Sequence, residues 1–155
     1  MDHIRLMKPY VTFEEVESDF REVFESGIFS RGKNIDAFRK EIADYTNATH
    51  TFLTTSATTA LWTCLKLLNV GQGDEIVISD FSFPASVNVV EDLGAKPVFA
   101  DVDLSTFNML PEDLELKITH KTKAVIFVDA LGNPTGLTKI KKICDKHCIP
   151  LIEDA

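Results

Sequence analysis

Residues 75–100 read EIVISDFSFPASVNVVEDLGAKPVFA, and this stretch decides the fold. A short apolar run (75–79) is followed by a helical stretch, a turn at Gly94 and a second apolar run (97–100). The alternation extends along the chain, with strands expected at 51–54, 75–79, 97–100, 124–128 and 149–153, and helices at 58–68, 85–93, 111–118 and 138–147. It predicts an α/β fold, in which a largely parallel sheet carries helices on both faces.

The first part of the chain has a different pattern. Thr12 and Glu15 have the spacing of a capping box, apolar residues follow at helical spacing, and Gly27 ends the predicted helix. A second helix is expected from Asn34 to Tyr45. We therefore divide the chain into an N-terminal helical segment, residues 1–48, and an α/β part, residues 49–155.

The composition argues against several classes of function. The chain has 155 residues, of which 45% are hydrophobic, and a formal net charge of −8. Because Lys and Arg form no cluster against this charge, we expect no nucleic acid as a partner. The apolar runs are far shorter than a membrane span, and residues 1–5 lack the apolar core of a signal peptide. We therefore expect a cytoplasmic protein that does not enter a membrane.

The three cysteines, Cys64, Cys144 and Cys148, fit no disulfide framework, as expected in a reducing compartment. Cys144 and Cys148 have the spacing of two metal ligands on one helical face. A structural zinc site usually needs four ligands in spaced pairs, and the sequence has no second cysteine pair. We therefore expect no metal site.

An open α/β sheet binds its ligand outside the carboxyl ends of its strands, so the residues that follow the strands are candidate site residues. The first expected strand leads into TTSATT (54–59), with five hydroxyls in six residues at a helix start. Free amides and hydroxyls at such a start bind phosphate, although simple capping of the helix by Ser or Thr also explains them. Neither a Walker loop nor a dinucleotide-binding glycine motif is present.

Two further strand ends carry aromatic or acidic residues. Phe81 and Phe83 follow the second expected strand, where one ring can stack on a planar ligand or both can belong to the core. Glu153 and Asp154 follow the last apolar run, where a carboxylate needs a cation or hydrogen-bond donors, or caps a nearby turn. A ligand that is planar, phosphorylated and cationic on its ring satisfies all three features, and pyridoxal phosphate has these properties. A carboxylate that keeps its pyridine nitrogen protonated makes the ring an electron sink.

These motifs, taken together and in this order, resemble the N-terminal part of the DegT-like nucleotide-sugar aminotransferases, which belong to the fold type I (aspartate aminotransferase) group of pyridoxal-phosphate enzymes. The resemblance covers nearly the whole chain. It rests on SRG (30–32), SATTAL (56–61), VGQGDE (70–75), FSFPAS (81–86), GAKPVF (94–99), DVD (101–103), THKTKA (119–124) and EDA (153–155).

The resemblance implies a role for four residues. Thr58 and Thr59 match the residues that hold the cofactor phosphate, Phe83 matches the aromatic that stacks on the pyridine ring, and Asp154 matches the carboxylate that pairs with the ring nitrogen. It also implies a homodimer with active sites at the subunit interface. The implied reaction moves an amino group from glutamate or glutamine to a keto-sugar carried on a nucleotide.

The sequence departs from the family pattern at several positions. Ala57 stands where many members have glycine, and Asp129 stands where histidine is common. The segment ALGNP (130–134) also resembles the related sugar 3-dehydrases, which keep the cofactor but replace the Schiff-base lysine with histidine. The branch of the family therefore stays open.

The residue that forms the Schiff base is expected beyond Ala155, and none of the chain's own lysines lies in the matching motif. The last predicted strand also ends the chain without a covering helix. We therefore expect an N-terminal part of a longer enzyme, with no catalytic residue of its own and no activity alone. A flavodoxin-like phosphate-binding module and a catalytically inactive paralogue are the alternatives.

Overall fold

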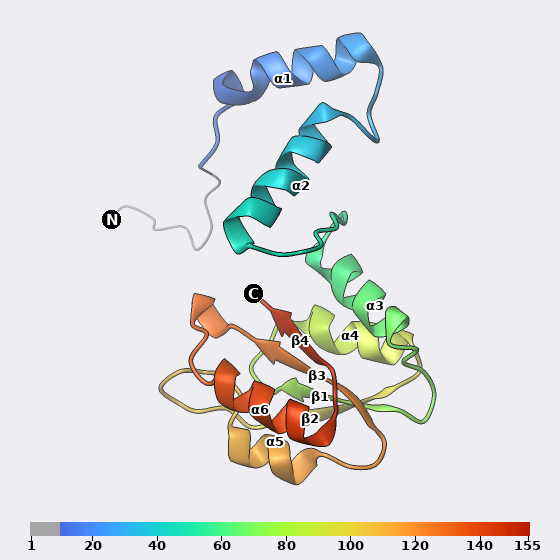
Figure 1. Ribbon diagram of the computed structural model, residues 1–155, viewed down its shortest axis with the longest axis vertical. Coiled ribbons are helices and arrows are strands. Elements are labelled where there is room, and N and C mark those ends of the chain that lie inside the picture. Colours follow the sequence, from blue (N-terminus) through green and yellow to red (C-terminus); the bar gives the residue numbers. More distant parts are fainter. Residues whose placement is uncertain (1–9) are drawn as a thin grey trace, which may run out of the picture. The chain divides into compact units, whose positions relative to one another are not determined.

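The computed structural model describes residues 10–155, which form two compact units, one ending at Leu53 and the other running from Thr54 to Ala155 (Figure 1). The helices are α1 (Phe13–Ser26), α2 (Lys33–Thr46), α3 (Ala57–Leu67), α4 (Pro84–Asp92), α5 (Pro111–Lys117), the 3₁₀ turn η1 (Ala130–Gly132) and α6 (Leu137–His147). The strands are β1 (Glu75–Ser79), β2 (Lys96–Ala100), β3 (Thr122–Val128) and β4 (Leu151–Asp154).

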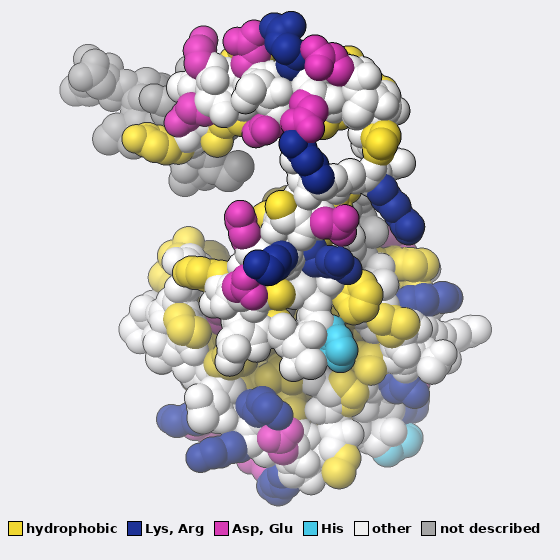
Figure 2. Space-filling model, turned by 45° about the horizontal axis from the view of Figure 1, so that its top comes forward, with side chains coloured by type: hydrophobic (Ala, Val, Ile, Leu, Met, Phe, Trp, Pro, Cys, Tyr) yellow, Lys and Arg dark blue, Asp and Glu magenta, His cyan; other side chains and the backbone are white. Residues whose placement is uncertain are grey.

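The first unit consists of α1 and α2, joined by a short link. The backbone amide of Thr12 donates to the Glu15 carboxylate at 2.8 Å, and Gly27 ends α1 in the left-handed region at φ 66°, so both predicted helix signals are confirmed. The first of these helices is rich in acidic residues, and Figure 2 shows acidic side chains spread over it. No residue of either helix is buried within the described part of the chain, so the apolar side chains of both helices are partly or fully exposed to solvent.

The second unit contains a four-stranded sheet in the order β2-β1-β3-β4, and every neighbouring pair is parallel (Figure 1). Ile76 is paired with Pro97 on one side and with Ala124 on the other, which places β1 in the middle of the sheet. All five residues of this strand are buried. Burial on both faces explains why its three central residues, 76–78, are all apolar rather than alternating with polar ones.

Helices cover both faces of the sheet, as predicted. One face packs Ile76, Ile78 and Ile126 against Leu65 of α3 and the valines of α4. The opposite face packs Val77, Val125 and Phe127 against α5 and α6. Side chains that alternate along each strand therefore feed two separate cores, and the predicted α/β fold is confirmed.

The strand order creates a topological switch point at the carboxyl edge of the sheet. The chain leaves β1 through α4 on one face and leaves β3 through α6 on the other, although these two strands are neighbours. Connections that depart to opposite faces make a topological switch point, where open α/β sheets bind ligands. The crevice expected here lies between the carboxyl ends of β1 and β3.

The strand predicted at residues 51–54 is wrong. These residues are irregular and pair with no strand among residues 10–155. Thr54 Oγ1 instead donates to the Ser56 carbonyl at 2.9 Å, within the turn that precedes α3. Threonine and phenylalanine favour strands only where a partner strand completes the ladder, and none does so here.

No helix in the described part of the chain is long and apolar enough to cross a membrane.

Candidate functional site

Asp154 lies at the carboxyl end of β4, and its side chain has a specific partner. Ser86 Oγ donates to Asp154 Oδ2 at 3.0 Å, across 68 positions of sequence. Ser86 lies in the first turn of α4 and is fully buried, whereas Asp154 is half-buried. The hydroxyl therefore orients the carboxylate and leaves part of it accessible to a ligand.

Phe83 caps the start of the same helix. Its backbone is extended, Pro84 occupies the first helical position, and the Phe83 carbonyl accepts a hydrogen bond from the Ser86 amide at 3.1 Å. The sequence left open whether this ring belongs to the core. The phenyl ring is 75% exposed, so it does not. Phe81, by contrast, packs against Phe107 with 5.1 Å between the ring centroids.

The hydroxyl-rich segment forms the start of α3. Ser56 is the N-cap, and its Oγ accepts a hydrogen bond from the Thr59 amide at 3.1 Å. The amides of Ala57 and Thr58 lie in the first turn, where an α-helix provides no acceptor for them. Capping by Ser56 and open amides therefore coexist, so the two interpretations of this segment are compatible.

Topology brings these groups to one edge of the sheet. The first turn of α4 directly follows β1, and α3 runs back toward the amino end of β1, so both helices begin at the carboxyl edge. The helix α3 packs against α4 and contacts β4. Asp154, Ser86 and Phe83 thus lie close together, while no hydrogen bond within residues 10–155 joins Thr58 or Thr59 to Asp154.

A second pair of carboxyl groups lies on the opposite face of the same strand ends. Burial, followed by the neighbouring Asp129 carboxyl, raises the pKa of Glu153 above its ordinary value. Asp129 Oδ1 is buried and has no hydrogen-bond partner among the described residues. Asp129 is the position at which the sequence departs from the family histidine, and the structure places it next to the switch point.

Ser86 was not predicted as a site residue. In the sequence it is the last residue of the FSFPAS motif (81–86) and a serine in the first turn of a predicted helix, and neither feature by itself assigns it a role. The bond to Asp154 spans 68 positions of sequence and depends on the tertiary structure, which brings the end of β4 to the first turn of α4.

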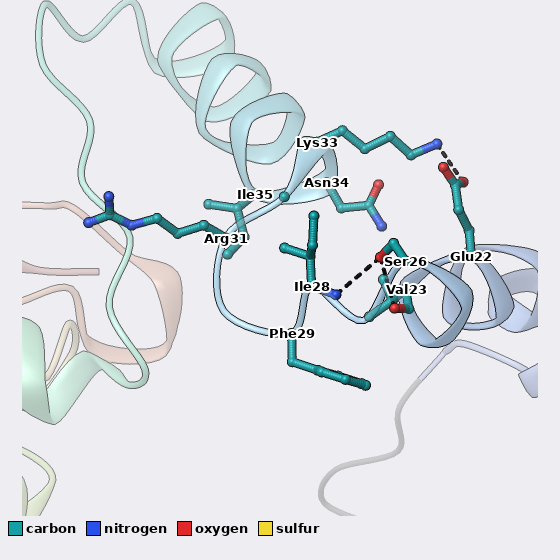
Figure 3. Close-up of a pocket in the computed structure, with 10 residues that line it drawn as sticks. Glu22, Val23, Ser26, Ile28, Phe29, Arg31, Lys33, Asn34 and Ile35 are labelled. Atoms are coloured by element: carbon teal, nitrogen blue, oxygen red, sulfur yellow. Dashed lines mark hydrogen bonds and ion pairs between the residues drawn. The ribbon is translucent and has the colours of Figure 1, made fainter.

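A hollow of about 300 Å³ lies elsewhere, in the link between α1 and α2 (Figure 3). Ile28 and Ile35 line it, and the ion pair between Lys33 and Glu22 lies at its rim. None of the four predicted site residues borders this hollow. Among the described residues, no three His, Cys, Asp or Glu side chains gather as a metal site would require, and all three cysteines are free.

Comparison with known proteins identifies the class. The sequence profile of the DegT/DnrJ/EryC1/StrS aminotransferase family matches residues 12–155, so the chain belongs to this family. The resemblance found in the sequence motifs is thereby confirmed.

Three relatives illustrate the match. The spore coat polysaccharide biosynthesis protein SpsC of Bacillus subtilis is 36% identical over 147 residues, which are 95% of this chain and 38% of the relative. The GDP-perosamine synthase of Vibrio cholerae is 37% identical over 82% of this chain and 35% of its own length. The structure of a putative sugar aminotransferase of Streptococcus pneumoniae, in its PLP form, superimposes with a TM-score of 0.86 at 30% identity, covering 93% of this chain and 36% of the other. The chain thus spans less than two fifths of the length of these relatives.

Proposed function

We propose that this chain supplies the phosphate, ring-stacking and ring-nitrogen contacts of a pyridoxal-phosphate site in a sugar aminotransferase. The observation that carries the proposal is the Asp154 carboxylate, held by Ser86 at 3.0 Å where the strands end and two helices begin. Membership of an aminotransferase family supports it, as does the solved PLP form of a relative. We further propose residues 49–155 as the cofactor-binding part and residues 1–48 as a helical segment of different role.

The residues present fit this cofactor. The open amides at the start of α3, together with the hydroxyls of Thr58 and Thr59, suit a phosphate group. The exposed ring of Phe83 suits one face of a pyridine, and Asp154 suits a protonated ring nitrogen. All three groups stand at the carboxyl edge of one sheet, as the switch-point rule requires.

When bound, pyridoxal phosphate supplies an electron sink for the carbon next to the substrate nitrogen. The role of Asp154 is to hold a proton on the ring nitrogen, because a carboxylate beside that nitrogen stabilises the charged form. Ser86 keeps Oδ2 of this carboxylate in one orientation. Phe83 would pack on one face of the ring, and Thr58 and Thr59 would hold its phosphate at the start of α3.

The reaction we infer is the transfer of an amino group from glutamate or glutamine to a keto-sugar nucleotide, by a homodimer. Relatives named for GDP-perosamine synthesis and for amination of a UDP-linked 3-oxo sugar support this substrate class. The three free cysteines support a reducing compartment such as the cytoplasm. The segment ALGNP (130–134), which resembles the corresponding segment of the sugar 3-dehydrases, favours a second candidate, a sugar 3-dehydrase that uses the same cofactor.

The test uses the intact protein that carries this sequence. Asp154→Asn keeps the size of the side chain and removes its charge, and we expect about a 100-fold loss in the release of 2-oxoglutarate from glutamate. Asp92→Asn is the matched control, because Asp92 is exposed at the far end of α4. Wild-type rates in the Asp154→Asn protein would overturn the role of the carboxylate.

We also propose that residues 1–155 alone do not transaminate, because none of their lysines lies in the motif that the family uses for the nucleophile. Release of 2-oxoglutarate by the purified 155-residue chain would contradict this.

A further inference from the structure

Asn108 is a buried side chain that joins two loops. It lies in the connection between β2 and α5 and is only 1% exposed. Its Oδ1 accepts a hydrogen bond from the Ala130 amide at 3.0 Å, and its Nδ2 donates to the carbonyls of Asn133 and Thr135 at 2.5 and 2.8 Å. One side chain therefore serves three backbone groups of a segment that lies more than twenty positions away in sequence.

The segment held by Asn108 is the switch-point loop, which we define as residues 129–136. It directly follows β3 and contains the turn η1. Within it Leu131 has φ 56°, in the left-handed region that costs a residue with a β-carbon free energy, and this leucine is 84% exposed. Such a backbone persists only where surrounding contacts hold it, and Asn108 provides three hydrogen bonds to the loop from outside it.

The loop is in turn bonded to the backbone of Asp154. The Asp129 amide donates to the Asp154 carbonyl at 2.9 Å, next to the Ala130 amide that Asn108 holds. Ser86 fixes the carboxylate of Asp154 from the other face of the sheet. The carboxylate that we assign to the cofactor nitrogen is thus supported at its side chain by Ser86 and at its main chain by the loop.

We propose that Asn108 is a positioning residue of this site: by holding Ala130, it fixes the switch-point loop and, through Asp129, the backbone of Asp154. This inference rests on the proposed function for its effect on the cofactor. The effect on the loop itself does not depend on that function. The hydrogen bonds of the Asn108 side chain go to residues 130, 133 and 135 and to none of the four predicted site residues, so we expect it to act through the loop.

The first measurement is hydrogen exchange of the intact protein without cofactor. In Asn108→Ala we expect the amides of residues 130–133 to exchange at least about tenfold faster, while the amides of β1 keep their protection. Leu114→Ala is the control, because Leu114 is fully buried on the same face of the sheet and forms no part of the loop. If Asn108→Ala does not fold, Asn108→Ser, which keeps a hydroxyl, is measured in the same way.

The second measurement is titration with pyridoxal 5′-phosphate. Residues that orient a site's binding groups typically contribute about tenfold to affinity, so we expect Kd to rise about tenfold in Asn108→Ala relative to Leu114→Ala. Equal affinities in the two variants, or unchanged exchange of residues 130–133, would refute the positioning role. If the wild-type protein does not bind pyridoxal phosphate, the proposed function fails together with the cofactor part of this proposal, and the exchange data still decide whether Asn108 holds the loop.

Discussion

Two buried serines at the carboxyl edge of the sheet provide a controlled comparison. Ser86 and Ser79 are both fully buried. Ser86 Oγ donates to Asp154 Oδ2 at 3.0 Å, whereas Ser79 Oγ has no hydrogen-bond partner within residues 10–155. Replacing each serine by alanine removes the same atom from the same degree of burial, so the difference between the variants reports the hydrogen bond.

The expected loss of stability in Ser86→Ala depends on the charge of the hydrogen-bond partner, Asp154. A hydrogen bond to a charged group contributes about 1.5–3 kcal/mol. Asp154 is half-buried, so water replaces part of the lost bond, and alanine is a better helix former than serine in α4 by a few tenths of a kcal/mol. We therefore expect Ser86→Ala to lower the free energy of unfolding by about 1 kcal/mol. Ser79→Ala removes an unsatisfied hydroxyl, and we expect a change within about 0.5 kcal/mol or a slight gain.

The assay is thermal unfolding of the cofactor-free protein. A loss of about 1 kcal/mol lowers Tm by about 2–4 °C in a cooperative unit of about 150–250 residues, so the expected difference between the variants is measurable. Equal destabilisation by both substitutions would show that packing rather than the bond to Asp154 matters. An unchanged Tm in Ser86→Ala would show that the carboxylate is not held as described.

Two further predictions concern ionisable groups outside the site. The pKa of Glu75 is lowered, first by the hydrogen bond that Thr119 Oγ1 donates to its carboxylate at 2.7 Å. A depressed folded-state pKa contributes stability above the unfolded value, and this contribution is lost as the pH falls below about 4 through the folded value. Thr119→Val should therefore make the acid limb of urea-derived stability shallower, and an equally steep limb would contradict this assignment. Burial raises the pKa of Cys144 to about 11, so among the three cysteines of this chain Ellman's reagent at pH 8 should label Cys64 and Cys148 but not Cys144 until the protein is denatured. Rapid labelling of Cys144 in the native protein, assigned by peptide mass, would refute the burial.

Local pattern predicted the second unit well. The strand at residues 75–79 has the predicted bounds, because an apolar β-rich run between a glycine turn and polar residues has one favourable conformation in a buried sheet. The helices of this unit differ from their predicted bounds by about one residue, since Pro84 and Pro111 mark helix starts in the sequence itself. The prediction of a strand at 51–54 was wrong, because a strand forms only next to a partner strand, and the local sequence pattern does not show whether a partner is present.

The candidate site, like the fold, could be predicted from the sequence only in part. Position along the sequence pointed to three strand-end segments, because open α/β sheets place their ligand groups there. The family resemblance then narrowed these segments to Thr58, Thr59, Phe83 and Asp154, whose roles stay predictions. Only the tertiary structure decided that Ser86 holds Asp154 and that Asn108 holds the loop at residues 129–136. These bonds connect positions that become neighbours through the strand order β2-β1-β3-β4. A serine at a helix start or an asparagine in a loop can form hydrogen bonds with many different groups. The order of the strands brings one particular partner within reach of each side chain.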